Sequence, residues 1–240
     1  FSVSSSNGFN ITASDDIVNG TTLNLQLQVQ DNNGYNRSEN IVLNVGTVSM
    51  DDPLGPDQYG YYIYDSGDTD YDLAPNYDWI EISGSGSNLN LSNSGNGNWS
   101  GNGPLADVDL PFTFTYYGID YNSITVCTNG WIVLGETGSA AFRNYPVPGP
   151  GGPSPMIAAF WDDLETGNNG DVYVYSTNQY VIIEWHNMKT NWGNDNNTFQ
   201  IIIYNDSPQP NGDNSIKIQY QDFNNTSSGS FSSYPPIHGS

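Results

Sequence analysis

Cysteine, positive charge and long apolar runs are scarce in this chain of 240 residues. The single cysteine, Cys127, excludes an internal disulfide. Four Lys and Arg residues stand against 26 Asp and Glu residues, which gives a formal net charge of −22. So acidic a chain should repel nucleic acid and anionic membranes and attract cations. We therefore expect no nucleic-acid partner. We also expect no membrane insertion, because no apolar run approaches the roughly 18 residues of a membrane-spanning helix.

Turn-forming residues are abundant instead. The chain contains 32 Asn and 26 Gly residues, which favour turns together with the many Asp residues. Helical periodicity is nearly absent, whereas alternating or β-branched segments recur between clusters of Gly, Asn, Asp and Pro. The sequence therefore predicts an all-β protein that forms an antiparallel β-sandwich. Extracellular chains without disulfides are common in bacteria, so we expect a prokaryotic surface or secreted protein.

The first 49 residues predict a hairpin of immunoglobulin-like strands. The segment TTLNLQLQVQ alternates strictly, and one face of it carries Leu23, Leu25, Leu27 and Val29. The turn segment DNNGYN follows, and NIVLNVGTV would pair with the first strand. About 50 residues are too few for a complete sandwich of about 100. We expect the missing strands to lie upstream or to come from another chain. Residues 50–60, with two prolines, are expected to be a linker.

Strand signals become dense from residue 105 onward. Seven candidate strands follow within about 120 residues, and their short connections predict mostly antiparallel pairing. The candidates are PFTFTYYGI, SITVCTNGWIVLG, PMIAAFWDDL, GDVYVYST, QYVIIEWHNM, NTFQIIIYND and NSIKIQYQDF. A Gly/Ser/Asn-rich segment, residues 83–104, precedes them and is expected to be a mobile loop inside the domain.

This series of strands resembles the nidogen-like extracellular domain over residues 105–225. Four short combinations carry the resemblance: Asn-Gly-Trp, Ala-Phe-Trp-Asp-Asp, Glu-Trp and Phe-Gln. The resemblance implies a nidogen-like sandwich over residues 61–240, with an extracellular and non-catalytic role in adhesion or assembly. The segment before it, DPLGPDQYGYYIYDSGDTDYDLAPNYDWIEI, looks like a module that precedes such domains in large secreted bacterial proteins, including gingipain-type peptidases.

The chain departs from the family pattern at its end. The family usually continues past the last strand with a Gly-Ile-Glu-like segment, whereas this chain stops at YPPIHGS. Together with the incomplete sandwich at the front, this gives two interpretations. Either the chain is cut from a longer protein, or neighbouring subunits complete its sheets by strand addition.

Asp162 and Asp163 end the apolar segment PMIAAFWDD and have three interpretations. Neighbours on a strand point to opposite faces, so they do not form the close pair that two-carboxylate catalysis needs unless the strand ends between them. At the exit of a buried strand they would accept backbone N–H bonds or bind calcium. We favour the structural interpretation, with calcium second.

A better calcium candidate is the segment DSGDTDYD. It places four carboxylates within eight residues and without a local Lys or Arg: Asp65, Asp68, Asp70 and Asp72. Calcium takes six to eight oxygen ligands in flexible loops. The spacing is not that of an EF-hand, and a solvated acidic hairpin is the competing interpretation.

The sequence argues against an enzyme. It contains neither a His-Glu-x-x-His zinc motif nor a Gly-x-Ser-x-Gly elbow. Cys127 alternates with apolar neighbours and is expected to be a buried thiol, not the partner of His186. Glu184 is expected to pack beside Trp185 at a sheet surface. Transition metals lack the His and Cys ligands that they prefer.

Tryptophans and asparagines suggest binding and modification sites. Trp131, Trp161 and Trp185 lie in strand patterns and should be core residues, whereas Trp99 and Trp192 lie in Asn/Gly loops and suit either protein contacts or sugar stacking. Nine Asn-x-Ser/Thr sequons are candidates for glycosylation. They start at Asn10, Asn19, Asn36, Asn90, Asn98, Asn196, Asn205, Asn224 and Asn225.

Two functions are therefore expected in competition. The first is a non-catalytic structural or adhesive protein of a cell surface or extracellular filament, which assembles with itself or with neighbouring domains through strand pairing and aromatic contacts. The second is a carbohydrate-binding accessory region of a secreted peptidase or glycosidase. Calcium is the one cofactor that the acidic loops suggest.

Overall fold

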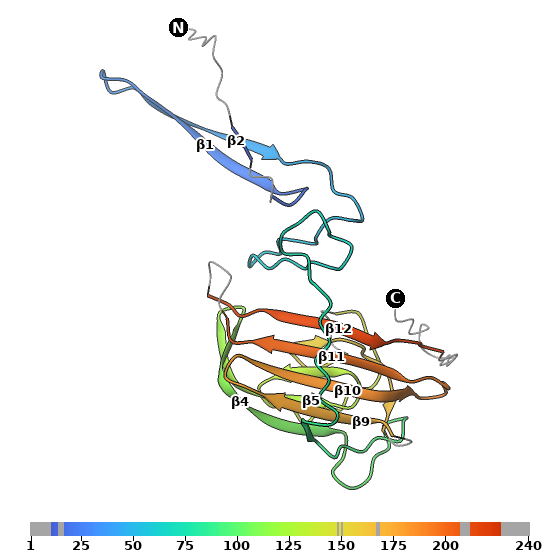
Figure 1. Cartoon of the computed structure of the whole chain (residues 1–240). Helices are drawn as coiled ribbons and strands as arrows, with labels where there is room; N and C mark the ends of the chain where they lie inside the picture. The colour runs from blue at the N-terminus through green and yellow to red at the C-terminus, as the bar shows by residue number, and fades with distance from the viewer. Residues whose placement is uncertain are drawn as a thin grey trace. The chain divides into compact units, whose positions relative to one another are not determined.

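The computed structural model describes residues 11–13, 17–147, 149, 151–166, 169–206 and 212–226. The chain divides into two compact units, Phe1–Tyr77 and Asp78–Ser240. Every regular element of the described residues is a β-strand, and all the strand pairs are antiparallel (Figure 1). The predicted all-β class is therefore confirmed.

The first unit contains a two-stranded ribbon, β1 (Thr22–Gln30) and β2 (Asn36–Asn44). Leu25 lies opposite Ile41 and Leu23 opposite Leu43, so the leucines of β1 share one face with apolar residues of β2, as their alternation predicts. β2 begins earlier than expected because Asp31 closes the turn. Its Oδ1 accepts the N–H groups of Asn33 and Tyr35, each at 2.8 Å.

The rest of the first unit is ordered by aspartate caps. Leu54 and Ile63 form an isolated antiparallel bridge. Between them, Asp57 Oδ1 accepts the N–H groups of Tyr59, Gly60 and Tyr61 at 2.8–2.9 Å. Residues 50–60, described from the sequence as a linker, therefore form a hydrogen-bonded turn in the structure.

The second unit is a sandwich of two sheets. One sheet has six strands: β12 (Ile216–Asp222), β11 (Asn197–Tyr204), β10 (Tyr180–Thr190), β9 (Asp171–Ser176) and β3 (Ser87–Asn88), with β8 (Leu164–Glu165) also on β10. The other has four: β4 (Leu105–Tyr116), β5 (Ile119–Cys127), β6 (Trp131–Leu134) and β7 (Met156–Ala158).

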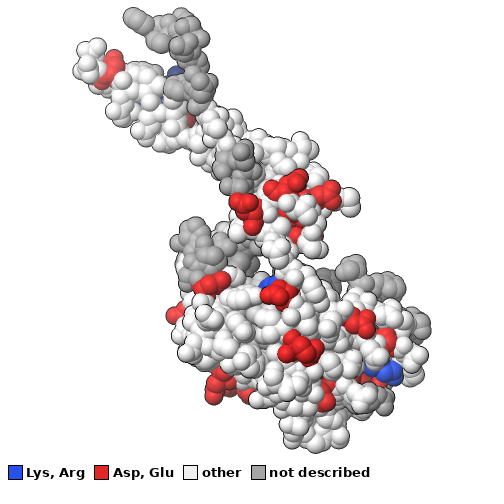
Figure 2. All heavy atoms as spheres, viewed as in Figure 1, with Lys and Arg blue, Asp and Glu red and all other residues white. Residues whose placement is uncertain are grey.

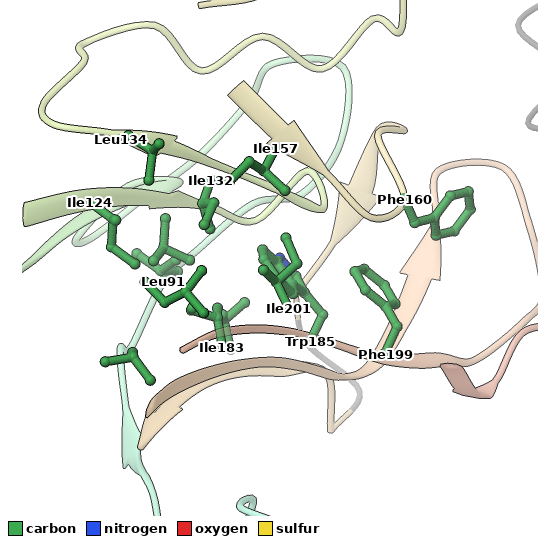
Figure 3. Packing of buried hydrophobic residues seen from close by; sticks show 14 of the residues in the cluster. Leu91, Ile124, Ile132, Leu134, Ile157, Phe160, Ile183, Trp185, Phe199 and Ile201 are labelled. Carbon is green, nitrogen blue, oxygen red and sulfur yellow. The ribbon is translucent and has the colours of Figure 1, made fainter. Parts of the chain in front are cut away.

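The core lies between these two sheets. Ile124 and Ile132 of the four-stranded sheet face Ile183, Trp185 and Ile201 of the six-stranded sheet (Figure 3). Burying apolar area of this kind is the main stabilising contribution to a fold, at about 25 cal/mol per Å². The indole of Trp185 is fully buried, and its Nε1–H donates to the carbonyl oxygen of Cys127 at 2.8 Å. The ring of Trp185 is thus buried without leaving its N–H donor unpaired.

Two predicted strands are shorter than expected. The segment SITVCTNGWIVLG is not one strand but the hairpin β5–β6, which turns at residues 128–130. The apolar segment 156–161 is strand only as far as Ala158, because the N–H groups of Ala159 and Phe160 both turn to the carbonyl oxygen of Gly130. The two errors have different causes. The apolar segment 156–161 shows no alternation that would mark where its strand ends, whereas the first segment contains the turn residues Asn129 and Gly130.

An extended segment crosses the outer face of the six-stranded sheet (Figure 1). We call residues 78–82 the crossing segment. It runs over β12, β11 and β10 and buries Ile82 against Ile182 and Ile202. Three polar side chains of the sheet bind its backbone. Gln219 Nε2 donates to the oxygen of Asp78 at 2.9 Å, Gln200 Nε2 donates to that of Ile80 at 2.6 Å, and Glu184 accepts the N–H of Ile82 at 3.3 Å.

Candidate functional site

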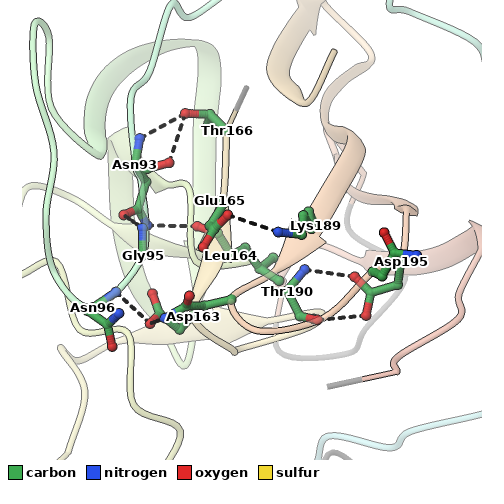
Figure 4. A network of polar contacts seen from close by, with 12 residues as sticks. Asn93, Gly95, Asn96, Asp163, Leu164, Glu165, Thr166, Lys189, Thr190 and Asp195 are labelled. Atoms are coloured by element: carbon green, nitrogen blue, oxygen red, sulfur yellow. Dashed lines mark hydrogen bonds and ion pairs between the residues drawn. The ribbon is translucent and has the colours of Figure 1, made fainter. Parts of the chain in front are cut away.

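The loops at one end of the sandwich form a continuous polar network. In one sheet, Leu105 pairs with Cys127, so the turn after β5 lies beside the loop before β4. In the other sheet, Met188 pairs with Asn197 at the turn between β10 and β11. Hydrogen bonds then join residues 93–96, 128–129, 163–166 and 190–195 (Figure 4).

Asn93 is the centre of this network. Its buried Nδ2 lies within hydrogen-bonding distance of Thr128 Oγ1, Asn129 Oδ1 and the oxygen of Leu164, at 2.8–3.1 Å. Its backbone N–H donates to Thr166 Oγ1 at 2.8 Å, and its backbone oxygen accepts the N–H of Thr166 at 2.9 Å. One asparagine therefore fixes the Gly/Ser/Asn-rich segment, expected to be mobile, to two other loops.

Asp163 joins the loops that carry the two candidate tryptophans. Its Oδ2 accepts the N–H of Asn96 at 2.7 Å and the Nδ2–H of Asn191 at 2.8 Å (Figure 4). Burial raises the pKa of Asp163, against the lowering effect of these hydrogen bonds. The neighbouring Asp162 accepts the N–H of Asp163 at 2.7 Å, and burial raises its pKa as well. Both aspartates thus accept hydrogen bonds from backbone N–H groups in the structure.

Asp195 holds the second loop. It is buried, and its two oxygens accept the N–H and the hydroxyl of Thr190 at 2.8 and 2.6 Å. Burial acts to raise its pKa, but the hydrogen bonds from Thr190 and Thr226 outweigh burial and hold the pKa below its ordinary value. A Cβ atom on Gly193 would overlap Thr190 Oγ1, so only glycine fits there. The 190–195 turn is therefore a rigid support.

Trp99 and Trp192 project from this support. Their side chains are 53% and 70% exposed, while Trp131, Trp161 and Trp185 are buried as expected. Trp192 has a φ of 68°, in the left-handed region that bulky residues rarely adopt. The two loops pack tightly, because a Cβ atom on Gly95 would lie 2.7 Å from the side-chain carbon of Asn191. We call Trp99 and Trp192 with their loops the tryptophan surface.

The comparisons with known proteins agree with this sandwich. The family model described as NIDO related matches residues 75–234, two thirds of the chain.

The chain belongs to the NIDO-related family.

This membership confirms the predicted nidogen-like domain. Nidogen-like domains are an extracellular type of module. The family match does not cover the immunoglobulin-like strands expected before the domain. No curated protein and no solved structure matches the chain. The described residues contain no helix that is long and apolar enough to cross a membrane.

A second polar cluster of this NIDO-related sandwich lies on its outer face. Glu184 is fully buried beneath the crossing segment, not placed at an open sheet surface as its alternation suggested. Its Oε1 lies 2.9 Å from His186 Nδ1, and Glu81 of the crossing segment lies close to both. Burial raises the pKa of Glu184, and the nearby charge of Glu81 raises it further. Sequence reasoning missed this cluster because 103 positions separate Glu81 from Glu184.

The acidic turn of the first unit uses two of its carboxylates as caps. Asp68 is buried, and its Oδ2 accepts the N–H of Asp65 at 2.6 Å. Asp65 Oδ1 accepts the N–H of Gly67 at 2.6 Å, while Asp70 and Asp72 are exposed. These four residues do not come together as a metal-ligand group among the described residues, nor do Asp162 and Asp163. Calcium binding at either place stays a prediction.

The predicted glycosylation sites differ in accessibility. Asn10 lies outside the described residues. Asn19 is half-buried, and its Nδ2 donates to Asp52 at 2.9 Å, so a glycan there would displace this bond. Asn205 is exposed, although its Nδ2 donates to the oxygen of Asn178 at 2.8 Å. The remaining sequon asparagines are exposed as well, and they are Asn36, Asn90, Asn98, Asn196, Asn224 and Asn225.

Proposed function

We propose that this chain is a non-catalytic extracellular module that acts in adhesion or structural assembly, with the tryptophan surface as its contact site. One observation carries the proposal: two exposed indoles stand on loops that hydrogen bonds to Asp163 join to each other. Aromatic side chains on rigid supports lose little conformational entropy on binding, and tryptophans are frequent among the residues that dominate binding energy.

The backbone of Trp192 adds to this support. A residue in a sparsely populated φ region costs about 1–3 kcal/mol and persists only where its surroundings hold it there. Here Asp195 and Gly193 hold the turn, and the result is an indole that is 70% exposed. The turn therefore presents an exposed indole from a backbone that its neighbours hold in place, which suits a contact site.

The ribbon of the first unit supports assembly by strand pairing. β1 and β2 pair only with each other among the described strands, and their shared apolar face includes Leu23, Leu25 and Ile41. Two-stranded ribbons are marginally stable in water, and a further strand or sheet would cover this face. Strand addition by a neighbouring chain or domain would supply that cover.

The second candidate function is carbohydrate binding at the same surface. Asparagines flank both indoles, at Asn98 and Asn102 near Trp99 and at Asn191 and Asn194 near Trp192. An indole face with neighbouring amides suits a sugar ring and its hydroxyl groups. The chain would then be an accessory region of a secreted hydrolase.

Light scattering and glycan-array binding on the same preparations separate the two candidates. We expect the full chain to associate with itself or with a surface protein, and Trp99→Ala and Trp192→Ala to weaken that association at least about tenfold. Tyr117→Ala is the matched control, because its exposed ring lies at the opposite end of the sandwich, in the turn between β4 and β5. Binding to glycans that both Trp variants lose would support the second candidate. Association unchanged in both variants, with no glycan bound, would refute the tryptophan surface.

A further inference from the structure

The outer face of the six-stranded sheet brings together three side chains with the donor set of a transition-metal site. Glu184 and His186 lie two positions apart on β10, so both point to the same face of the sheet. Glu81 reaches them from the crossing segment. One ligand atom from each residue, two carboxylate oxygens and one imidazole nitrogen, lies within 4.8 Å of the other two.

The spacing fits a small divalent ion. Zn²⁺ binds imidazole nitrogen and carboxylate oxygen at about 2.0–2.2 Å, so two neighbouring ligand atoms in one site stand about 3.0–3.5 Å apart. His186 Nδ1 and Glu184 Oε1 are already 2.9 Å apart. Glu81 is exposed, so its carboxylate can close the remaining distance without repacking the core. Its exposure also leaves a path for the ion and for a water ligand.

Other groups orient these ligands. Gln200 Nε2 donates to Glu184 Oε2 at 2.8 Å, which leaves Oε1 directed at His186. The two oxygens of Glu81 accept the N–H of Ser83 at 2.8 Å and the Nε1–H of Trp79 at 3.2 Å. Hydrogen bonds of this kind to first ligands fix their orientation and strengthen metal sites.

The charge of the cluster favours a cation. Two carboxylates share one imidazole, and Glu184 is fully buried, where an uncompensated carboxylate is costly. The ring of Tyr173 on β9 stands edge-on to His186, 6.1 Å between centroids, and contributes no positive charge. Calcium is a poor match, because it takes oxygen ligands only and one of the three donors here is nitrogen.

We propose that Glu81, Glu184 and His186 bind one divalent transition-metal ion of the zinc type, which fastens the crossing segment to β10. An ion held between these residues joins the start of the second unit to the middle of its six-stranded sheet. Binding to the folded state alone then stabilises the sandwich in proportion to the logarithm of metal concentration.

Zinc titration of the chelator-treated full chain by calorimetry tests this proposal, with Co²⁺ absorption as a second readout. We expect one Zn²⁺ per chain, bound with micromolar affinity and not displaced by millimolar Ca²⁺. Glu81→Gln and His186→Asn should each weaken binding about 100-fold. In the wild type, but not in these variants, Zn²⁺ should also raise the unfolding temperature followed by tryptophan fluorescence.

The controls separate this site from general binding to an acidic surface. Glu136→Gln removes an exposed carboxylate elsewhere, and His238→Asn removes the other histidine of the chain. Both should bind Zn²⁺ as the wild type does. The proposal is overturned if Zn²⁺ does not bind, if Glu81→Gln and His186→Asn bind it as tightly as the wild type, or if only one of the two variants is affected. Glu81 is exposed, so folding of Glu81→Gln is expected and is verified by its metal-free unfolding curve.

Discussion

At the scale of single residues, the backbone around each carboxylate decides what it does, because exposed Asp57 and Asp65 accept backbone N–H groups as buried aspartates do. Asp195 and Asp68 are buried and accept backbone N–H groups, whereas Asp70 and Asp72, which lie in the same acidic segment as Asp68, are exposed. A sequence shows that carboxylates are close along the chain, but it does not show which of them turn inward. The acidic segment 65–72 therefore suggested a cation site from sequence, and half of its carboxylates are caps in the structure.

Cys127 should be unreactive in the folded chain. Its thiol is fully buried, and burial raises its pKa to about 12, so almost no nucleophilic thiolate forms at neutral pH. We expect a disulfide reagent at pH 8 to leave the native thiol unmodified for hours and to titrate one thiol per chain in denaturant. Rapid labelling of the native protein would show that Cys127 is accessible.

Asp52 should give the first unit a dependence on acid pH. Tyr71 O–H donates to it at 2.6 Å, and with the N–H of Ser49 and the amide of Asn19 lowers its pKa from 3.8 to about 2. A carboxyl whose folded pKa is depressed stabilises the fold above its unfolded pKa and loses this contribution as pH falls through its folded pKa. The loss should therefore occur between about pH 4 and pH 2.

The carboxyl carbon shift of Asp52 measures this titration directly. We expect a midpoint near 2 in the wild type. Tyr71→Phe removes the strongest donor, so its midpoint should move upward and its acid unfolding should begin at a higher pH. A wild-type midpoint at the ordinary aspartate value would contradict the hydrogen bonds seen at Asp52.

At the scale of elements, the alternation of apolar and polar residues made β1 predictable, whereas the ends of other strands and the crossing segment were harder to predict. β1 has one apolar and one polar face, so its register follows from the sequence. β5 and β6 are buried on both faces near their shared turn, and what separates them in the sequence is the turn pair Asn129 and Gly130. The crossing segment was missed for another reason: the side chains that bind its backbone come from β10, β11 and β12, more than 100 positions later.

Gly130 should be essential for the β5–β6 hairpin. It has a φ of 78°, and a Cβ atom there would overlap the carbonyl oxygen of Phe160. We expect Gly130→Ala to lower the free energy of unfolding by about 4 kcal/mol, since backbone strain and a steric clash combine. Gly135→Ala is the matched control: its φ is 84°, but its added Cβ would meet only Tyr121 at 3.8 Å. It should cost about 1–2 kcal/mol. Equal losses in urea unfolding would exclude the clash.

Gln200 should hold the crossing segment to the sheet. Its buried amide donates to Ile80 and Glu184 and accepts from Gln219 at 3.0 Å. Gln200→Leu removes these three hydrogen bonds, although Glu184 keeps the N–H of Ile82 and Gln219 keeps the oxygen of Asp78. We expect a loss of about 3 kcal/mol. Gln221→Leu, at an exposed position of β12, should change stability by less than about 0.5 kcal/mol. We expect hydrogen exchange at the Ile82 amide to be faster in Gln200→Leu only, which would locate the loss of stability at the crossing segment. Equal exchange rates in both variants would contradict a role of Gln200 in holding this segment.

At the scale of the whole molecule, charge and burial are unevenly distributed. Acidic side chains are scattered over the visible face of both units, and basic side chains are few (Figure 2). Such a surface keeps proteins soluble but repels itself, so salt should stabilise it. Buried apolar side chains, in contrast, are concentrated in the second unit. In the described part of the first unit the buried apolar side chains are Val18 and Pro53, whereas the sandwich buries about two dozen.

The two units should therefore unfold in separate steps. All six tryptophans lie in the second unit, between residues 79 and 192, while the first unit contains seven of the 17 tyrosines. Fluorescence excited at wavelengths that only tryptophan absorbs thus follows the sandwich alone. Far-ultraviolet circular dichroism follows both units.

We expect circular dichroism to show a transition at low urea that tryptophan fluorescence does not, followed by one that both signals share, because small buried apolar area gives the first unit little stability. Tyr71→Phe should shift only the first transition and Gly130→Ala only the second. Coincident curves in both signals, moved together by either variant, would mean that the units unfold as one cooperative body. The stability of the ribbon β1–β2 would then depend on the sandwich and not on strand addition by a partner.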